Sequence, residues 1–365
     1  MPDGPDRDNL RPRPRPARLT IRDVARLANV SVGTVSKALN NSGSLREETR
    51  ERVIASARQL GFHANDLAHS LHRGQSLTVG LISTDSFGRF TIPIMEGLEE
   101  CLADSRIGVF MCNATDDPER EARHVQQLLG KRVDGIVVTA RRADRRPKLD
   151  VPAPDLPVLY VFSQIDDPEA CCLLPDDEGG ARMAVEHLVR LGRRRIAHVT
   201  GPERFQAVRL RRDGYRAALG AAGLAEPEGF YLPGVWSEGW GREAVAELLR
   251  SRREPPDAVF CGNDQIARGA VDALRERGVI VPDAVAIVGF DNWEIMADAT
   301  RPPLTSVDMN LRELGREAGA TLLQMIAGRP VQGVRRLPCT LVVRDSCGAR
   351  AMGATSIAGS DPVQP

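Results

Sequence analysis

The feature that most constrains the fold is a regular alternation of short apolar runs and amphipathic segments after Gly74. Strand-like runs occupy residues 78–82, 108–112, 135–139, 158–162, 195–200, 258–261 and 285–290. Segments with helical spacing of apolar residues occupy residues 92–103, 118–129, 178–191, 209–222, 241–250, 265–277 and 311–327. Strands that are apolar throughout and alternate with helices are typical of parallel sheets covered on both faces. About 270 residues follow this pattern, enough for two doubly wound sheets. The sequence therefore predicts an α/β body.

The segment before the body has a different, purely helical pattern. Thr20 is placed to cap a first short helix, with Asp23 reaching back to it, and Ser31 is placed to cap a second. A third helix is expected over residues 47–60, ended by a glycine. Two short helices with a tight break between them are the geometry that places one helix in a DNA major groove. The exposed positions of the second helix are polar, as contact with bases and phosphates requires: Ser31, Gly33, Thr34, Ser36, Lys37 and Asn40.

The charge distribution supports an interaction of this head with a polyanion. The 365-residue chain holds 49 Lys+Arg and 49 Asp+Glu, so its net charge is zero. Residues 10–75 carry twelve basic and five acidic residues, which leaves 37 basic and 44 acidic residues elsewhere. A basic head on an acidic body indicates DNA binding. The alternatives are a solvated charged face, or a small three-helix domain that binds protein.

Several classes of protein are excluded by what the sequence lacks. No apolar run of ~18 residues or more predicts a transmembrane helix, and the N-terminus has no secretory signal. Residues 1–18, rich in Arg and Pro, are expected to be a disordered leader, and residues 348–365 a frayed tail. Seven cysteines without metal-ligand spacing indicate reduced thiols in a cytoplasmic protein. His69 and His72 have no third ligand beside them, so no metal site is expected. With no phosphate loop, nucleophile elbow or zinc motif, we expect neither an enzyme nor a cofactor.

From Leu19 to about Asp345 the sequence resembles the lactose-repressor/galactose-repressor family of transcriptional regulators. The motifs that carry the resemblance, in order, are TIRDVARLANVSVGTVSKALN, EETRERVIASARQLGF, ANDLAHSL, LTVGLI, VDGIVV, GGARMAVEHLVRLGRRRIAHVTGP, GNDQIARGA and VPDAVAIVGFDN. The resemblance implies an all-α helix–turn–helix head without a wing, a hinge helix, and a two-subdomain body of the periplasmic-binding-protein type. It also implies a homodimer on palindromic double-stranded operator DNA.

The resemblance assigns DNA contacts residue by residue. In the head they fall on Thr20, Ser31, Val32, Gly33, Ser36, Lys37 and Asn40, and in the hinge helix, residues 65–71, on Asn65, Ala68 and Leu71. A leucine wedge in the minor groove would unstack a base step and kink the duplex. Two residues depart from the family pattern. Ala64 replaces a common proline and Arg46 a common serine cap, and both changes are expected to loosen local order.

The resemblance also implies an effector pocket between the two subdomains, at the carboxyl ends of the strands. The matching polar residues are Arg209, Asn263 and Asp291, which could supply the hydrogen bonds that a polyol needs. Trp236 matches an aromatic on which a sugar face can stack, and Phe87 and Phe90 could form the opposite wall, although core packing explains each aromatic equally well. Phe162 stands where the lactose repressor has an aspartate, which weakens any transfer of ligand identity.

The domain boundaries follow from these assignments. We expect the head over residues 19–63, a hinge and linker over 64–76, and an effector-binding and dimerisation domain over 77–347. Within this domain, one subdomain is expected at about 77–174 plus 307–335, and the other at about 175–306 plus 336–347. The sequence thus predicts a cytoplasmic repressor of a sugar or nucleoside uptake or utilisation operon, released or tightened by a small-molecule effector. The alternatives are a free solute-binding receptor, which the head argues against, and a nucleotide-dependent enzyme, which lacks catalytic residues.

Overall fold

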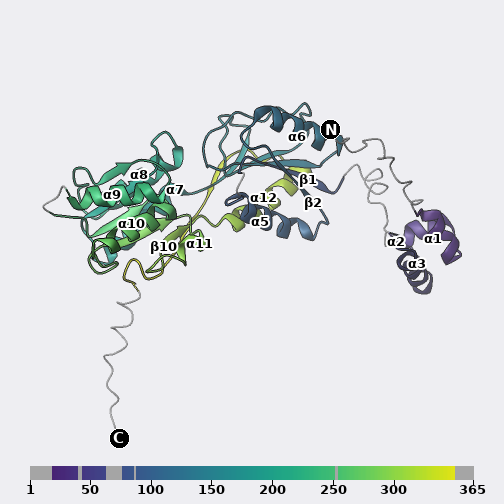
Figure 1. The fold of residues 1–365 in the computed structure, drawn as a ribbon. Coiled ribbons are helices and arrows are strands. Elements are labelled where there is room, and N and C mark those ends of the chain that lie inside the picture. Colours follow the sequence, from purple (N-terminus) through teal and green to yellow (C-terminus); the bar gives the residue numbers. More distant parts are fainter. Residues whose placement is uncertain (1–18, 40–42, 63–75, 86–87, 251–253, 350–365) are drawn as a thin grey trace, which may run out of the picture. The chain divides into compact units, whose positions relative to one another are not determined.

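The computed structural model describes residues 19–39, 43–62, 76–85, 88–250 and 254–349. The hinge-helix assignment over residues 65–71 lies outside the described residues. The chain divides into two compact units at residues 76/77, a head and a body, each described here by itself. Figure 1 shows the helices of the head and the two lobes of the body. No helix in the described ranges is both long and apolar enough to cross a membrane.

The head consists of three helices, as the sequence predicts: α1 (Ile21–Ala28), α2 (Val32–Leu39) and α3 (Glu47–Leu60). At the start of α1, the Thr20 backbone N–H donates to the Asp23 carboxylate over 2.9 Å, so the expected return contact is present. The hydrogen bond from the Thr20 hydroxyl, together with that from the backbone N–H, lowers the pKa of Asp23. A small apolar core joins the helices: Val24, Ala25, Ala28, Val35, Ala38, Val53 and Ala57. It fixes α2 against α1 and α3, which leaves the other side of α2 exposed.

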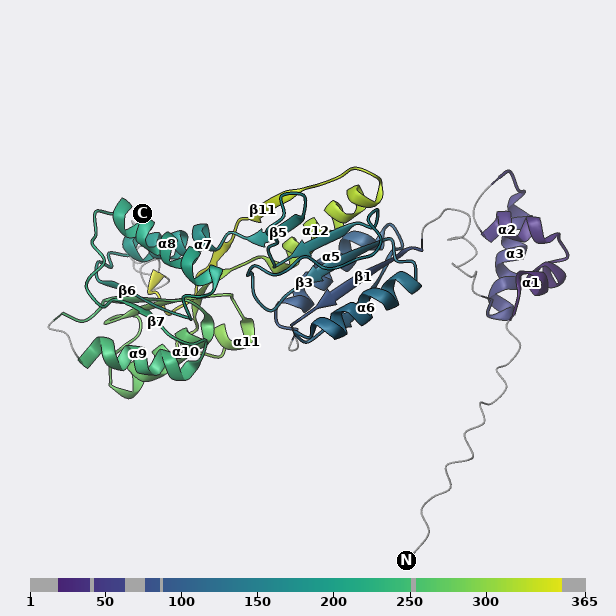
Figure 2. The same cartoon turned by 90° about the horizontal axis from the view of Figure 1, so that it is seen from above.

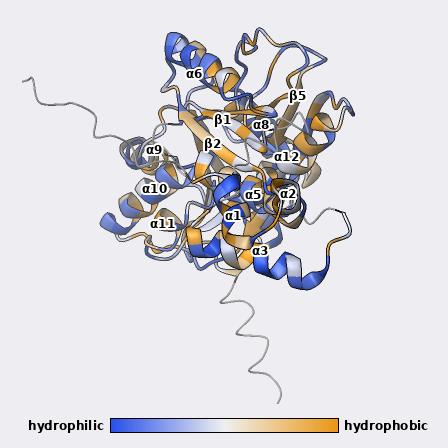
Figure 3. Ribbon diagram, turned by 90° about the vertical axis from the view of Figure 1, so that its right-hand side faces the viewer, coloured by the Kyte–Doolittle hydropathy of each residue, from blue (hydrophilic) through white to orange (hydrophobic). Residues whose placement is uncertain are grey.

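The first lobe of the body is a six-stranded sheet with the order β11-β5-β4-β3-β1-β2, in which every neighbouring pair is parallel. The strands are β1 (Thr78–Ser83), β2 (Gly108–Asn113), β3 (Gly135–Thr139), β4 (Val158–Val161), β5 (Cys171–Pro175) and β11 (Gly333–Leu337). Helices α5 (Thr91–Ala103) and α12 (Leu311–Ile326) cover one face and α6 (Pro118–Gly130) the other (Figure 1). In Figure 3, α6 is largely hydrophilic on its outside, whereas β1 and β2 are hydrophobic.

The second lobe repeats this architecture with the strand order β12-β10-β9-β8-β6-β7. Its strands are β6 (Ile196–Thr200), β7 (Tyr231–Pro233), β8 (Ala258–Cys261), β9 (Ala286–Phe290), β10 (Thr305–Asp308) and the antiparallel edge strand β12 (Thr340–Val342). Its helices are α7 (Asp177–Arg190), α8 (Gln206–Ala221), α9 (Glu238–Arg250), α10 (Asp264–Glu276) and the short α11 (Glu294–Ala297). Figure 2 shows α7 and α8 on one face of the sheet and α9 and α10 on the other. The prediction of two doubly wound sheets is confirmed.

The chain passes between the lobes three times: after β5, after β10 and after β11. Two of the expected boundaries need correction. Strand β10 pairs with β9 of the second sheet, so residues 307–308 do not open the return to the first lobe. Strand β11 pairs with β5 through Leu337, so residues 336–337 still belong to the first sheet. In both cases backbone pairing carries the strand past the expected boundary.

Candidate DNA-binding surface and effector site

The second helix of the head, α2, is the candidate recognition element, and Ser31 caps it. The Ser31 hydroxyl accepts the Thr34 backbone N–H over 3.1 Å and lies 2.9 Å from the Thr34 hydroxyl. Since the cap satisfies one of the first free N–H groups of α2, it fixes where the helix begins. Ser31 itself remains exposed, so its oxygen can still face an external partner.

The residues assigned to DNA contact share one side of α2. Val35 and Ala38 are buried in the head core, whereas Val32 has 41% of its surface exposed. Exposed or half-buried residues among the assigned set are Thr20, Ser31, Val32, Gly33, Thr34, Ser36 and Lys37. Asn40, Asn65, Ala68 and Leu71 lie outside the described residues. The described part of the assignment is therefore a contiguous, accessible surface of small polar groups and one cation, as groove contact requires.

In the body, the centre of the candidate effector site is Arg211, which the sequence analysis did not single out. Its guanidinium is 5% exposed and bonds Asp177 through two nitrogens, Nε at 2.8 Å and Nη2 at 2.7 Å. Nη1 donates to the Gly262 carbonyl over 2.5 Å and lies 3.6 Å from the Asp291 carboxylate. The guanidinium also stacks 3.6 Å from the centre of the Phe290 ring. Arg211 thus connects α7, α8 and the ends of β8 and β9.

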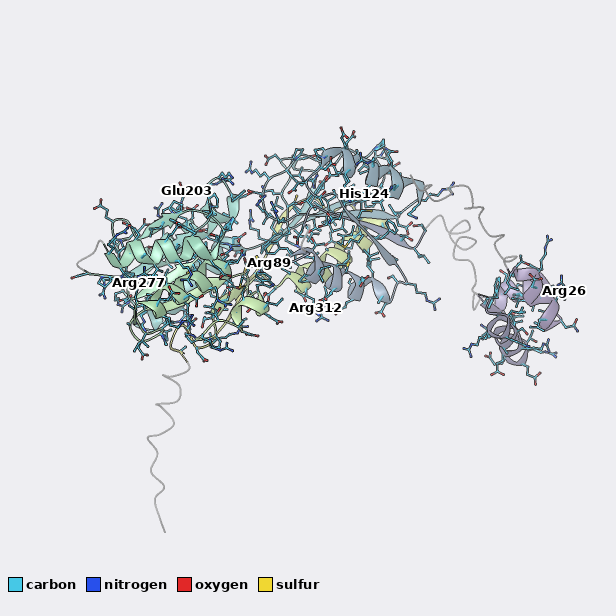
Figure 4. All side chains as sticks on the ribbon, in the orientation of Figure 1. Arg26, Arg89, His124, Glu203, Arg277 and Arg312 are labelled. Carbon is cyan, nitrogen blue, oxygen red and sulfur yellow. The ribbon has the colours of Figure 1, made fainter. Side chains whose placement is uncertain are left out.

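The prediction for Arg209 needs correction. Arg209 is exposed, and its guanidinium donates to the backbone carbonyls of Glu203 and Arg204, over 2.9 and 2.7 Å. Figure 4 labels Glu203 at the upper margin of the second lobe. Two residues along a helix rotate a side chain by about 200°, so Arg209 and Arg211 face opposite sides of α8. The spacing of the buried residues Val208, Arg211 and Tyr215 marks the inner face, and this signal could have identified Arg211.

Asp291 and Asn263 lie at the strand ends, as the sequence analysis placed them: Asp291 directly follows β9, and Asn263 is the second residue after β8. Asp291 is almost buried, with 6% of its side chain exposed, and its backbone has φ = +100°. A non-glycine residue in this region is strained, and such strain clusters at functional sites. Asn263 caps α10, since its Oδ1 accepts the Ile266 backbone N–H over 2.8 Å. Its amide is therefore held in one orientation, and Asn263 is 4% exposed.

Buried carboxyls surround this group. Burial raises the pKa of Asp177, against the opposing effect of Arg211. Burial also raises the pKa of Asp264 to about 7, helped by the charge of Asp291. Asp264 accepts the Ser306 hydroxyl over 2.6 Å and the Trp293 backbone N–H over 2.7 Å, so it ties β10 to the turn after β9. These contacts hold Asp291 and its neighbours in place.

Of the aromatic residues assigned to the pocket, the structure describes Phe90 and Trp236. Phe90, in the first lobe, stacks on Phe162 with ring centres 4.9 Å apart. Phe162 has φ = +57°, a second strained backbone beside the lobe junction. Trp236 packs its indole against Gly201, after β6, where any β-carbon would fall 2.3 Å from the ring. Phe87 lies outside the described residues.

The first lobe contributes a further residue that the sequence analysis missed. Arg89 donates to the Asp291 carboxylate over 2.5 Å, and Figure 4 labels it where the two lobes meet. The junction also holds a hydrogen bond from the Gln206 backbone to Asp144 (2.9 Å) and a contact between the Gln206 and Gln164 amides (3.1 Å). Groups from both lobes therefore converge on Asp291.

Two other kinds of ligand site, a surface hollow and a metal site, have less support. A hollow of 590 Å³ is lined by Arg145, Arg146 and Lys148, and each of these cations is paired with a carboxylate. Among the residues that the structure describes, no group of three or more His, Cys, Asp and Glu side chains could hold a metal ion. The junction around Arg211 and Asp291 thus remains the strongest candidate site.

Comparisons with known proteins place the head and the body in one family. Residues 20–65 match the model of the bacterial regulatory proteins of the lacI family, and residues 185–347 match the periplasmic binding protein-like domain. The ribose operon repressor of Escherichia coli K12 is 32% identical over 89% of this chain and 98% of its own length.

Solved structures of similar regulators also match most of the chain. The lac repressor dimer bound to operator and the anti-inducer ONPF superposes with a TM-score of 0.73 and 29% identity, over 91% of this chain and 99% of that one. The transcriptional regulator CelR in complex with cellobiose gives a TM-score of 0.61 and 30% identity, over 90% and 100% of the two chains. Because almost the whole length of these relatives is matched, the chain belongs to the lacI family of bacterial regulatory proteins and is a DNA-binding transcriptional regulator.

Proposed function

We propose that this regulator is a homodimeric, cytoplasmic repressor of a sugar or nucleoside uptake or utilisation operon, controlled by a small molecule bound at the lobe junction. The ribose operon repressor and the CelR–cellobiose complex support the sugar class, and the lac repressor dimer on its operator supports the assembly. The observation that carries the proposal is the convergence of Arg211, Asp291 and Asn263 at the carboxyl ends of β8 and β9. Ligands of open α/β sheets bind at this edge.

The chemistry of the three side chains suits a polyol. Asp291 accepts hydrogen bonds from hydroxyls, Arg211 donates to them, and Asn263 can do both. Asp177, Gly262 and Asp291 hold Arg211, and the Ile266 backbone N–H holds Asn263, so little side-chain entropy is lost on binding. A ligand that touches both lobes changes the balance between two arrangements of the lobes, and this coupling transmits its binding to the head.

The experiment that tests the proposal is the substitution Asp291→Asn. The variant keeps the side-chain shape but removes the charged acceptor, so we expect effector affinity to fall by ~10-fold or more, since a charge-assisted hydrogen bond contributes about 1.5–3 kcal/mol. Operator affinity without effector should stay within about twofold of the parent's. Calorimetric titration of the full chain with pentoses, hexoses and nucleosides, beside a gel-shift on its own promoter, measures both quantities.

The matched control is Arg209→Gln, which alters an exposed guanidinium on the opposite side of α8 from Arg211. It should leave effector and operator affinity unchanged. A stable Asp291→Asn variant with the parent's effector affinity would contradict the proposed site, and a parent chain that binds no promoter DNA would contradict the proposed function.

A further inference from the structure

Arg89 is a buried cation that depends on one carboxylate. It comes from the turn before α5 in the first lobe, and its Nη2 donates to Asp291 Oδ2 of the second lobe over 2.5 Å. Only 14% of the Arg89 side chain is exposed. The guanidinium carbon lies 4.4 Å from the ring centre of Trp293 and 4.9 Å from that of Phe90, so aromatic rings take up much of its surroundings.

Asp291 is an ion-pair partner of both cations at the junction, Arg89 and Arg211, but the two cations do not depend on it equally. Arg211 has a second carboxylate, Asp177, bonded through two nitrogens at 2.8 and 2.7 Å. Within the described part of the chain, Asp291 is the one carboxylate in an ion pair with Arg89. The Nε atom of Arg89 is buried and has no hydrogen-bond partner there. Arg89 therefore has an unused donor and would lose its ion pair if Asp291 turned to a ligand.

This dependence sets a condition on the ligand. Under the proposed function, Asp291 accepts hydrogen bonds from effector hydroxyls, which compete with Arg89 for its carboxylate. A neutral ligand that wins this competition would leave the buried guanidinium without its hydrogen-bonded carboxylate, which is unfavourable. A ligand with its own carboxylate would replace Asp291 as the partner of Arg89 and could also reach the unused Nε.

We propose that the effector is a sugar acid with one carboxylate, an aldonate or a uronate, whose carboxylate binds Arg89 while its hydroxyls bind Asp291 and Arg211. The inference rests on the proposed function, because it assigns the ligand class for that same site. A monoanion fits better than a dianionic phosphate, because Asp291 and Asp177 lie close by and would repel the second charge.

The strand ends of the first lobe suit the same ligand. Thr139, the last residue of β3, and Ser163, two residues after the end of β4, are fully buried, and their hydroxyl oxygens have no partner among the described residues. Strands β3 and β4 are neighbours, and Thr139 pairs with Val161, so both hydroxyls belong to the same edge of the sheet. The residues that end these strands, Thr139, Phe162, Ser163 and Gln164, are all uncharged. These two strand ends thus offer hydroxyl donors, and the neighbouring carboxylates of Asp85 and Asp144 already accept backbone N–H groups.

The test is a calorimetric titration of the full-length parent with matched pairs of ligands. Glucuronate, galacturonate and gluconate are compared with glucose and galactose, and glucose 6-phosphate represents the dianion. We expect at least one sugar acid to bind 100-fold or more tightly than its neutral counterpart and than the phosphate. Arg89→Gln should weaken that sugar acid at least 30-fold, and Arg89→Lys, which keeps the charge, should weaken it less.

The control is Arg209→Gln, which removes an exposed positive charge that is bonded to backbone carbonyls and not to Asp291, and it should leave the affinity for the sugar acid unchanged. Melting curves show whether each variant is folded, and Arg89→Lys provides the comparison if Arg89→Gln is unstable. A neutral sugar or a nucleoside that binds well, without an effect of Arg89→Gln, would overturn the inference and leave the proposed function intact. Binding of none of these ligands by a parent that still binds operator would overturn both the inference and the effector part of the proposed function.

Discussion

At the scale of single residues, His198 is the most unusual titratable group of the second lobe. It is fully buried in β6, its Nδ1 lies 3.0 Å from the Phe260 carbonyl, and Nε2 has no partner among the described residues. Its ring stacks on Phe260 at 4.6 Å and packs against Tyr215 at 5.3 Å. Burial lowers the pKa of His198 to about 3. The folded lobe therefore holds this imidazole neutral.

The sign of the pH dependence follows from that shift. The pKa of an unfolded histidine is about 6.5, so below this pH the unfolded chain takes up a proton that the folded chain does not. The stability linked to His198 is complete above pH 6.5 and is lost as the pH falls toward 3. Between pH 7 and pH 5, His198 should lower the free energy of unfolding of the parent by about 2 kcal/mol. We expect His198→Phe, which keeps an aromatic ring, not to show this part of the decrease. Urea unfolding of parent and variant at both pH values measures the difference, and identical pH dependence would contradict it.

The residues of the candidate site show how far the sequence alone leads. Asp291 and Asn263 could be placed because they lie at the ends of apolar strands, and strand ends in a parallel sheet share one edge. Arg211 was missed because AVRLRRDGY contains three arginines, and only the helical phase of the buried residues distinguishes them. Arg89 could not be found in this way, since its partner Asp291 is 202 positions away and in the other lobe.

At the scale of elements, seven strands of the described residues were predicted and five were missed. Strands β3 and β8 have the predicted bounds. Strands β5 and β10 were missed although they are mostly buried, because CCLLP is short and TSVD is short and mostly polar. Strands β7, β11 and β12 were missed because they are short or largely exposed, and β11 reads GVRRL. Such edge strands are defined by backbone pairing with their neighbours, which local hydrophobicity does not record.

Close helix pairs are built on glycines. A β-carbon on Gly97 of α5 would lie 1.9 Å from the Arg312 carbonyl oxygen of α12, and one on Gly315 of α12 would lie 2.1 Å from the Ile94 carbonyl oxygen of α5. Helices α9 and α10 approach in the same way, since a β-carbon on Gly241 would lie 2.1 Å from the Ile266 carbonyl oxygen. Each helix pair lies on one face of its sheet, so these contacts set how closely the two helices lie side by side on that face.

The substitution Gly97→Ala should therefore destabilise the body. The added methyl group meets backbone atoms, which cannot rotate away, so α5 and α12 must separate, at a cost of roughly 1–3 kcal/mol or more. Gly220→Ala in α8 is the matched control, because no heavy atom lies within 4 Å of its β-carbon position. It should be neutral or stabilising by about 0.5–1 kcal/mol, as expected for alanine in a helix. Thermal unfolding of both variants measures the contrast, and a Gly97→Ala variant as stable as the parent would show that the helices are not in close contact.

At the scale of the whole molecule, the two-lobed body converts ligand chemistry into a mechanical change. Three chain crossings join the lobes, and Arg89, Asp144 and Gln206 make contacts across the junction. The sequence predicted both lobes, but not these contacts, since each joins segments that are distant in the chain. Any ligand that rearranges the pair Arg89–Asp291 would change how the lobes are held together, which makes this pair the candidate element for allosteric control.

Control of this kind makes a reciprocal prediction. If an effector changes operator affinity by some factor, saturating operator must change effector affinity by the same factor, because both describe one coupling free energy.

We expect Lys37→Ala, on the exposed side of α2, to weaken operator binding and reduce the slope of log affinity against log salt by about 1. Its effector affinity without DNA should equal the parent's, since the head and the body form separate compact units.

The measurement is a pair of titrations on the full chain, effector with and without operator, and operator with and without effector. In the parent, the effector should change operator affinity by the same factor as the operator changes effector affinity. If Lys37→Ala gives that same factor at a higher operator concentration, DNA contact and effector control are separable. Asp291→Asn should have the opposite effect to Lys37→Ala: we expect it to retain operator affinity and to lose effector affinity. If Lys37→Ala changed effector affinity in the absence of DNA, the two units would not be independent. If its operator affinity were unaltered, α2 would not be the recognition helix.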